Sequence, residues 1–141
     1  MTYNDWFDQH ATKHAKIMQK LEAQGLDEYD IVQYFIFDNM VKNEPDFCEL
    51  YATNTKCHEM YELNCYMCGC PHFRFNQTPV LEDDLEYHSV CSINSKRGKR
   101  TYTEDNQVHQ DCSGCTIPHG EDYILSNFDH DWLKMMKKVK N

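Results

Sequence analysis

The chain has 141 residues, of which 40% are hydrophobic and 26% are charged, so it suits a single domain with a packed core. Its 14 basic and 23 acidic residues give a formal net charge of -9, which argues against binding to nucleic acid or to an anionic membrane surface. No apolar run approaches the roughly 18 residues of a membrane-spanning helix, and no secretory pattern opens the chain, so we expect a cytoplasmic protein.

Two helices are predicted in the first third of the chain. Apolar residues recur at helical spacing from Trp6 to Leu21, and Gly25 is a natural stop for that helix. A second helix is expected over residues 27–42, and it ends before Pro45 because the residue that precedes a proline avoids the helical conformation.

The pattern of the sequence changes after residue 52. We expect one domain over residues 1–141, made of a helical N-terminal segment (1–52), a cysteine-rich region (53–121) and a C-terminal helix (122–141). Helical periodicity fades in the middle region, where residues 94–101 read as a hairpin or loop tip. The expected fold class is therefore small and α-rich, with short β-hairpins at most, and with helices packed around a loop-rich, metal-stapled centre.

Cysteine is the most informative residue type here. Eight cysteines and eight histidines occur in the chain, and seven of the cysteines lie between residues 57 and 115. Such density indicates disulfides in a secreted mini-protein, but a reducing cytosol makes metal binding or catalysis the better interpretation.

Two C-x-x-C pairs lead this region, Cys65 with Cys68 and Cys112 with Cys115. A C-x-x-C turn aims two sulfurs at one point, so two such turns predict a four-sulfur pocket suited to zinc or to an iron–sulfur cluster. The alternative without metal is that these residues are four buried thiols that pack as small hydrophobic groups.

Further donors remain for a second site of three thiolates and one imidazole, a common structural zinc set. They are Cys57, Cys70, Cys91, His58, His119 and, as a weaker candidate, His72. Because Cys68 and Cys70 are two residues apart, they could face different sites across an extended strand or serve one cluster. The predicted metal ligands are Cys57, His58, Cys65, Cys68, Cys70, Cys91, Cys112, Cys115 and His119.

The remaining cysteine, histidine and basic residues are interpreted as packing or surface residues. Cys48 lies outside the motifs and is expected to be a packed or surface thiol. His10 and His14 are four residues apart but have no further ligand tied to them, so we expect half-buried members of a helix face. The basic residues 96–100 read as a solvated turn, and no catalytic motif is found.

The motifs resemble the cysteine-rich small domain, a zinc-finger-like family of probable metal-binding proteins. The resemblance rests on Cys57-His58, on Asn64-Cys65 with Cys68 and Cys70-Pro71, and on Asp111-Cys112 with Cys115 and Pro118-His119, and it covers about residues 55–126. It implies metal binding, and some members are associated with cobalamin biosynthesis enzymes.

The expected function is that of a metal-binding protein with one or two zinc ions, acting without catalysis as an accessory or interaction module for a protein partner that the sequence does not name. One alternative is an iron–sulfur protein in redox chemistry or in cobalamin-related cofactor biosynthesis. Another is a metal carrier. No membrane partner is expected, and nucleic acid is disfavoured.

Overall fold

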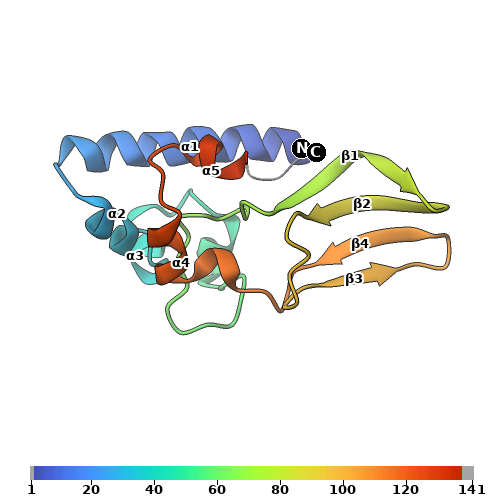
Figure 1. Cartoon of the computed structure of the whole chain (residues 1–141). Coiled ribbons are helices and arrows are strands. Elements are labelled where there is room, and N and C mark those ends of the chain that lie inside the picture. The colour runs from blue at the N-terminus through green and yellow to red at the C-terminus, as the bar shows by residue number, and fades with distance from the viewer. Residues whose placement is uncertain (1, 138–141) are drawn as a thin grey trace.

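The computed structural model describes residues 2–137 and contains one long helix, several short helices and a sheet (Figure 1). The helices are α1 (Tyr3–Ala23), α2 (Glu28–Tyr34), α3 (Phe37–Asn43), α4 (Glu121–Ser126) and α5 (Trp132–Met136), with the 3-10 helices η1 (Glu49–Thr53) and η2 (Ile117–His119). The strands are β1 (Phe73–Glu82), β2 (Leu85–Cys91), β3 (Lys99–Tyr102) and β4 (Gln107–Asp111).

The first predicted helix is confirmed as α1. Its start is a capping box, in which the Thr2 side chain accepts from the Asp5 amide and the Asp5 carboxylate accepts from the Thr2 amide. Its end lies just before Gly25, whose positive φ of 75° turns the chain away from the helix.

The second predicted helix is broken into α2 and α3. Ile36 adopts an extended conformation and forms an isolated β-bridge with Asn64. On either side of it, the Cys65 amide donates to the Phe35 carbonyl at 2.8 Å and the Phe37 amide donates to the Leu63 carbonyl at 2.8 Å. A partner distant in sequence therefore takes backbone bonds that a continuous helix would have used.

The C-terminal helix is also divided, into α4 and α5. α4 ends at Ser126, and α5 begins after Asp131, whose side chain accepts from the Leu133 amide. Between the two, the Tyr66 hydroxyl donates to the Asp129 carbonyl at 2.6 Å, so the break is held against the core. The last residues of the predicted C-terminal helix, 138–141, lie outside the described residues.

The expectation of a small α-rich fold with a loop-rich centre is wrong. Residues 73–111 form a four-stranded mixed sheet in the order β1-β2-β4-β3, so the chain has mixed α and β structure. β1 pairs with β2 and β3 pairs with β4 in antiparallel fashion, while β2 and β4 pair in parallel. The sequence does not predict these strands, because their side chains are mostly half-buried or exposed and the alternation of apolar and polar residues is weak.

The turns of the sheet depend on short polar residues. Asp83 and Asp84 both have positive φ, 53° and 64°, in a two-residue turn between the paired residues Glu82 and Leu85. Asp83 and Asp84 thus form the tip of the hairpin between β1 and β2. Residues 94–98, read from the sequence as part of a tip, instead form the turn that leads into β3.

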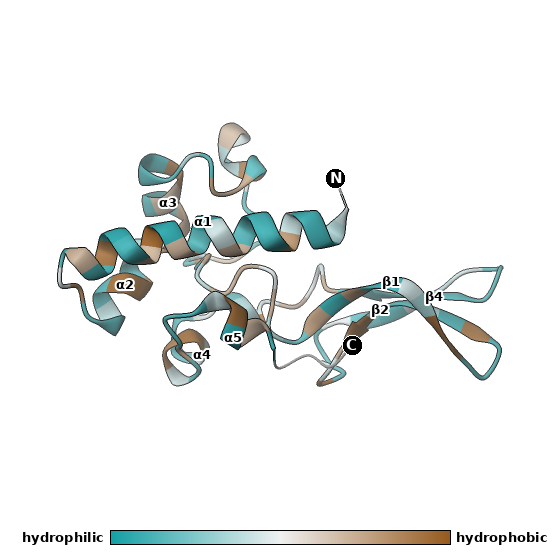
Figure 2. Cartoon of the chain, turned by 90° about the horizontal axis from the view of Figure 1, so that it is seen from above, coloured by the Kyte–Doolittle hydropathy of each residue, from teal (hydrophilic) through white to brown (hydrophobic). Residues whose placement is uncertain are grey.

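The hydrophobic core lies among the helices, where α1 runs alongside α5 and over α2 (Figures 1 and 2). Its fully enclosed side chains include Leu21 of α1, Ile31 of α2, Phe35 and Tyr66. The sheet contributes Val108 as its buried hydrophobic residue. The start of α1 also packs against β1, where the Tyr3 ring contacts Phe75 and the Asn4 side chain donates to Gln77.

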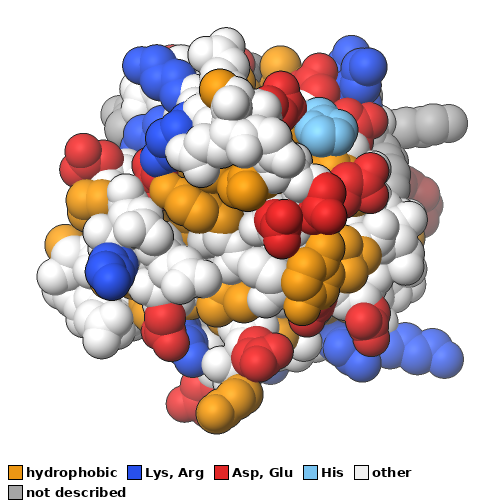
Figure 3. Space-filling model, turned by 90° about the vertical axis from the view of Figure 1, so that its left-hand side faces the viewer, with side chains coloured by type: hydrophobic (Ala, Val, Ile, Leu, Met, Phe, Trp, Pro, Cys, Tyr) orange, Lys and Arg blue, Asp and Glu red, His pale blue; other side chains and the backbone are white. Residues whose placement is uncertain are grey.

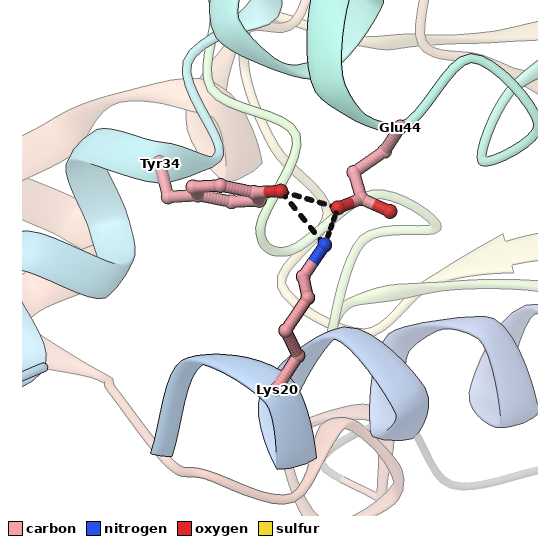
Figure 4. Close-up of polar contacts among 3 residues, drawn as sticks. All are labelled: Lys20, Tyr34 and Glu44. Atoms are coloured by element: carbon pink, nitrogen blue, oxygen red, sulfur yellow. Dashed lines mark hydrogen bonds and ion pairs between the residues drawn. The ribbon is translucent and has the colours of Figure 1, made fainter. Parts of the chain in front are cut away.

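The end of the molecule opposite the sheet is a mixture of small hydrophobic patches and acidic side chains (Figure 3). Lys20 of α1 forms an ion pair with Glu44 and donates to the Tyr34 hydroxyl, which donates to the same carboxylate (Figure 4). Across residues 2–137, the structure has no helix of the length and apolarity required to cross a membrane.

Candidate metal centre

The sheet brings four cysteines to its helical end (Figure 1). Cys70 precedes β1, Cys91 ends β2, and Cys112 and Cys115 follow β4. Because β1 is antiparallel to β2, and β2 is parallel to β4, the start of β1 and the ends of β2 and β4 meet at one edge. We call Cys70, Cys91, Cys112 and Cys115 the outer thiol group.

The outer thiols are held by tight turns whose amides point at sulfur. The His72 amide lies 3.4 Å from Cys70 Sγ, and the Ser95 amide lies 3.5 Å from Cys91 Sγ. The Ser95 hydroxyl also lies 3.5 Å from Cys115 Sγ. Such contacts stabilise thiolates, which are the form of cysteine that binds metal.

Two of the outer thiols, Cys70 and Cys112, would stay protonated without a cation nearby. Burial raises the pKa of Cys70 to about 11, and the neighbouring Cys91 and Cys115 act in the same direction. Burial likewise raises the pKa of Cys112 to about 11, with Cys70, Cys115 and Cys91 as further causes. A bound cation would remove both penalties, because it supplies the positive charge that a group of thiolates lacks.

A second cluster is formed by Cys57, His58 and His119, whose ligand atoms all lie within 4.8 Å of one another. His58 Nδ1 is 3.2 Å from Cys57 Sγ, and His119 Nε2 is 3.6 Å from the same sulfur. Among residues 2–137 this is the one such trio of metal-binding side chains, and its donor set is compatible with a metal ion.

The second nitrogen of each imidazole is bound to a backbone carbonyl. His119 Nδ1 lies 2.8 Å from the Asn64 oxygen, and His58 Nε2 lies 3.0 Å from the Cys112 oxygen. A carbonyl accepts only from an N–H group, so each ring carries its proton on the far nitrogen and turns a lone pair toward Cys57. This is the arrangement that orients metal-binding histidines. Burial lowers the pKa of His119, which also favours the neutral ligand form.

Cys65 and Cys68 lie on the Cys57 side of the molecule. Burial, with the Cys57 thiol as a further cause, raises the pKa of Cys65 to about 12. Burial also raises the pKa of Cys68 well above its usual value, with Cys65 and Cys57 as additional causes. We call Cys57, Cys65 and Cys68 the inner thiol group.

The turn that carries Cys65 and Cys68 is fixed by contacts with α2 and α5. The Asn64 side chain donates to the Val32 carbonyl and accepts from the Tyr66 amide, which ties the turn to α2. The Trp132 indole of α5 donates to the Cys68 carbonyl at 3.0 Å. After Cys68 the chain reverses at Gly69, which has a φ of 104°, and at Cys70, which has a φ of 63°. The reversal sends Cys68 and Cys70 to different groups, one of the two alternatives open from the sequence.

A cavity of about 340 Å³ lies between the two groups. Its walls hold all four outer thiols, and Cys57, Cys68, His58 and His119 from the inner side. His72 also lines it, but its Nε2 contacts the Tyr123 hydroxyl at 2.5 Å and its Nδ1 contacts the Ser92 hydroxyl, so both ring nitrogens are in use.

The nine predicted ligands therefore fall into two neighbouring clusters. This grouping differs from the one that the sequence first suggested, in which the two C-x-x-C pairs form one site. Cys65 and Cys68 group with Cys57, while Cys112 and Cys115 group with Cys70 and Cys91. Whether each residue binds a metal stays a prediction. Comparison of the chain with protein-family models, with curated proteins and with solved structures found no match in any of the three.

Proposed function

We propose that the chain is a zinc-binding protein in which metal ions hold the inner and outer groups together. The activity proposed is structural and non-catalytic: the metal stabilises a surface that serves a protein partner. We also propose that the chain belongs with the cysteine-rich small domains, on the strength of its motifs alone.

The observation that carries the proposal is the orientation of His58 and His119 around Cys57. Two imidazoles from separate parts of the chain each use one nitrogen on a backbone carbonyl and turn the other toward the same thiol. Histidines that serve only packing have no reason to converge on one sulfur in this way. A borderline-soft ion such as zinc suits the mixed nitrogen and sulfur donors.

The outer thiol group supports a second ion. Four thiols from three segments meet at one sheet edge, and two of them accept amide hydrogens. In this arrangement the metal supplies folding free energy that the sheet does not obtain from its own packing, since Val108 is its buried hydrophobic residue. The ion would join β1, β2 and β4 at the end where they enter the helical part.

Elemental analysis of protein purified without oxygen tests the proposal. We expect a colourless protein with zinc in a fixed ratio to the chain, whereas a brown protein that contains iron and sulfide would refute zinc and favour the iron–sulfur alternative. His119→Gln should lower the zinc content, while the matched control His109→Gln, a half-buried histidine of β4, should leave it unchanged. A protein with no bound metal would refute both alternatives.

A further inference from the structure

Cys48 lies beside the inner thiol group, although the sequence separates it from every metal motif. It immediately precedes η1 in an extended conformation and is half-buried. It shares the wall of a second cavity, of about 320 Å³, with Cys68. Its thiol is also close enough to Cys65 and Cys68 to raise the pKa of both. Four thiols, Cys48, Cys57, Cys65 and Cys68, therefore occupy one neighbourhood.

Two buried polar side chains next to these thiols, His10 and Tyr51, each have a nitrogen or oxygen atom without an oxygen or nitrogen partner among the described residues. His10 lines the same cavity as Cys48 and Cys68, is 3% exposed, and its Nε2 has no partner among the described residues. The Tyr51 hydroxyl, in a residue 5% exposed, has no oxygen or nitrogen partner among them and lies beside Cys65. A buried donor without an acceptor is costly, and metal-bound thiolates are strong acceptors that would satisfy it.

The number of donors exceeds what one ion can take. Six candidate donors lie in this neighbourhood. The ligand atoms of Cys57, His58 and His119 lie within 4.8 Å of one another, and the thiols of Cys48, Cys65 and Cys68 are close enough to influence the pKa values of their neighbours in the group. A tetrahedral ion binds four donors, whereas two ions offer eight positions. Cys57 is the member that contacts both imidazoles and also neighbours the other thiols. If Cys57 binds both ions, the six donors fill seven of the eight coordination positions.

We propose that Cys48, Cys57, Cys65, Cys68, His58 and His119 form a dinuclear zinc centre in which the Cys57 thiolate bridges the two ions. One ion takes Cys57, His58 and His119 and keeps one position open toward solvent, where Cys57 is exposed. The other takes Cys48, Cys57, Cys65 and Cys68. This rests on the proposed function, and with the outer group it makes three ions per chain.

Charge balance supports two ions over one. Four thiolates around a single divalent cation leave a net charge of -2 at a site that the protein partly encloses, while two divalent cations leave the centre neutral. An uncompensated charge in a low-dielectric site is costly, so the neutral arrangement is favoured.

The test uses the full chain, loaded with zinc without oxygen and then freed of excess metal by gel filtration. We expect three zinc ions per chain. We also expect Cys48 to resist iodoacetamide until a chelator is added, as followed by peptide mass spectrometry. Cys48→Ser should hold one ion fewer after equilibration with a competing chelator that leaves the unsubstituted chain at three. The control Cys91→Ser should lose an ion from the outer group while Cys48 stays protected.

Each contrary result has a distinct meaning. Two ions per chain would overturn the dinuclear centre and leave the proposed function intact. Three ions with Cys48 alkylated equally fast before and after chelation, or three ions retained by Cys48→Ser, would overturn the role of Cys48. A chain that binds no zinc would overturn the proposed function and this inference together.

Discussion

His14 is a buried histidine whose replacement tests how the helical core responds to pH. It is fully enclosed, its Nε2 lies 3.1 Å from the Tyr66 oxygen, and its ring stacks on Phe35 with centroids 5.1 Å apart. Burial lowers its pKa from 6.5 to about 4. The substitution His14→Phe keeps an aromatic ring in the stack but removes the titrating group.

The sign of the effect follows from proton uptake. The unfolded chain protonates His14 near its ordinary pKa, while the folded chain resists protonation until about pH 4, so stability falls as the pH drops through this window. Between about pH 7.5 and about pH 5, these two pKa values give a loss of about 2 kcal/mol in the free energy of unfolding. His14→Phe does not suffer this loss.

Urea denaturation of both proteins at a series of pH values measures the effect. Metal release and the titration of His10 occur in both proteins, so they largely cancel in the difference between them. At neutral pH the variant should be less stable by about 1–3 kcal/mol, because the Tyr66 carbonyl loses its donor. That deficit should shrink by about 2 kcal/mol near pH 5. The exposed control His130→Gln should show a much smaller change, and a pH-independent deficit in His14→Phe would refute the reasoning.

Three further substitutions test the supports of the site and fold. Asn64→Leu leaves the Val32 carbonyl and the Tyr66 amide unpaired, so chemical denaturation should show a loss of about 2–4 kcal/mol; a neutral result would show that Asn64 is not needed to hold the turn that carries Cys65 and Cys68. Gly69→Ala places a Cβ 3.1 Å from Trp132 Cζ2 at a φ of 104°, and it should cost about 1–3 kcal/mol and lower the thermal midpoint. The control Gly120→Ala, with open space around the new Cβ, should not; equal midpoints for the two would contradict the strain argument. Lys20→Met removes a partly exposed ion pair and should cost less than about 1 kcal/mol in urea denaturation, so a loss well above that would show stronger coupling between α1 and Glu44 (Figure 4).

Features that depend on neighbours in sequence were predictable. α1 has an apolar face at helical spacing and a glycine just beyond its end, so its span follows from local preferences. The candidate ligands were also recognisable, since the repeated C-x-x-C spacing constrains the sulfurs within each turn. His10 and His14 lie on the buried face of α1, and their burial is nearly complete rather than half.

The break between α2 and α3 shows where local reasoning fails. No proline or glycine interrupts residues 28–43, so the sequence favours one helix. The backbone of residues 35–37 instead bonds to residues 63–65, and this pairing also positions Cys65. Hydrogen bonds between segments about 30 residues apart outweigh the small helical preference of each residue. The spacing of residues in the sequence does not reveal such a pairing.

The candidates for metal binding can be identified from the sequence, because ligand chemistry and turn spacing are local properties. Their grouping depends on the tertiary structure. The antiparallel pairing of β1 and β2 places Cys91 at the start of β1, and the parallel pairing of β2 and β4 brings Cys112 to the same end of the sheet. The reversal at Gly69 separates Cys68 from Cys70. The turn before η1 likewise places Cys48 next to thiols that follow it by 9 to 20 residues. Distances between such segments depend on the packing of the whole chain, so no motif in the sequence specifies them.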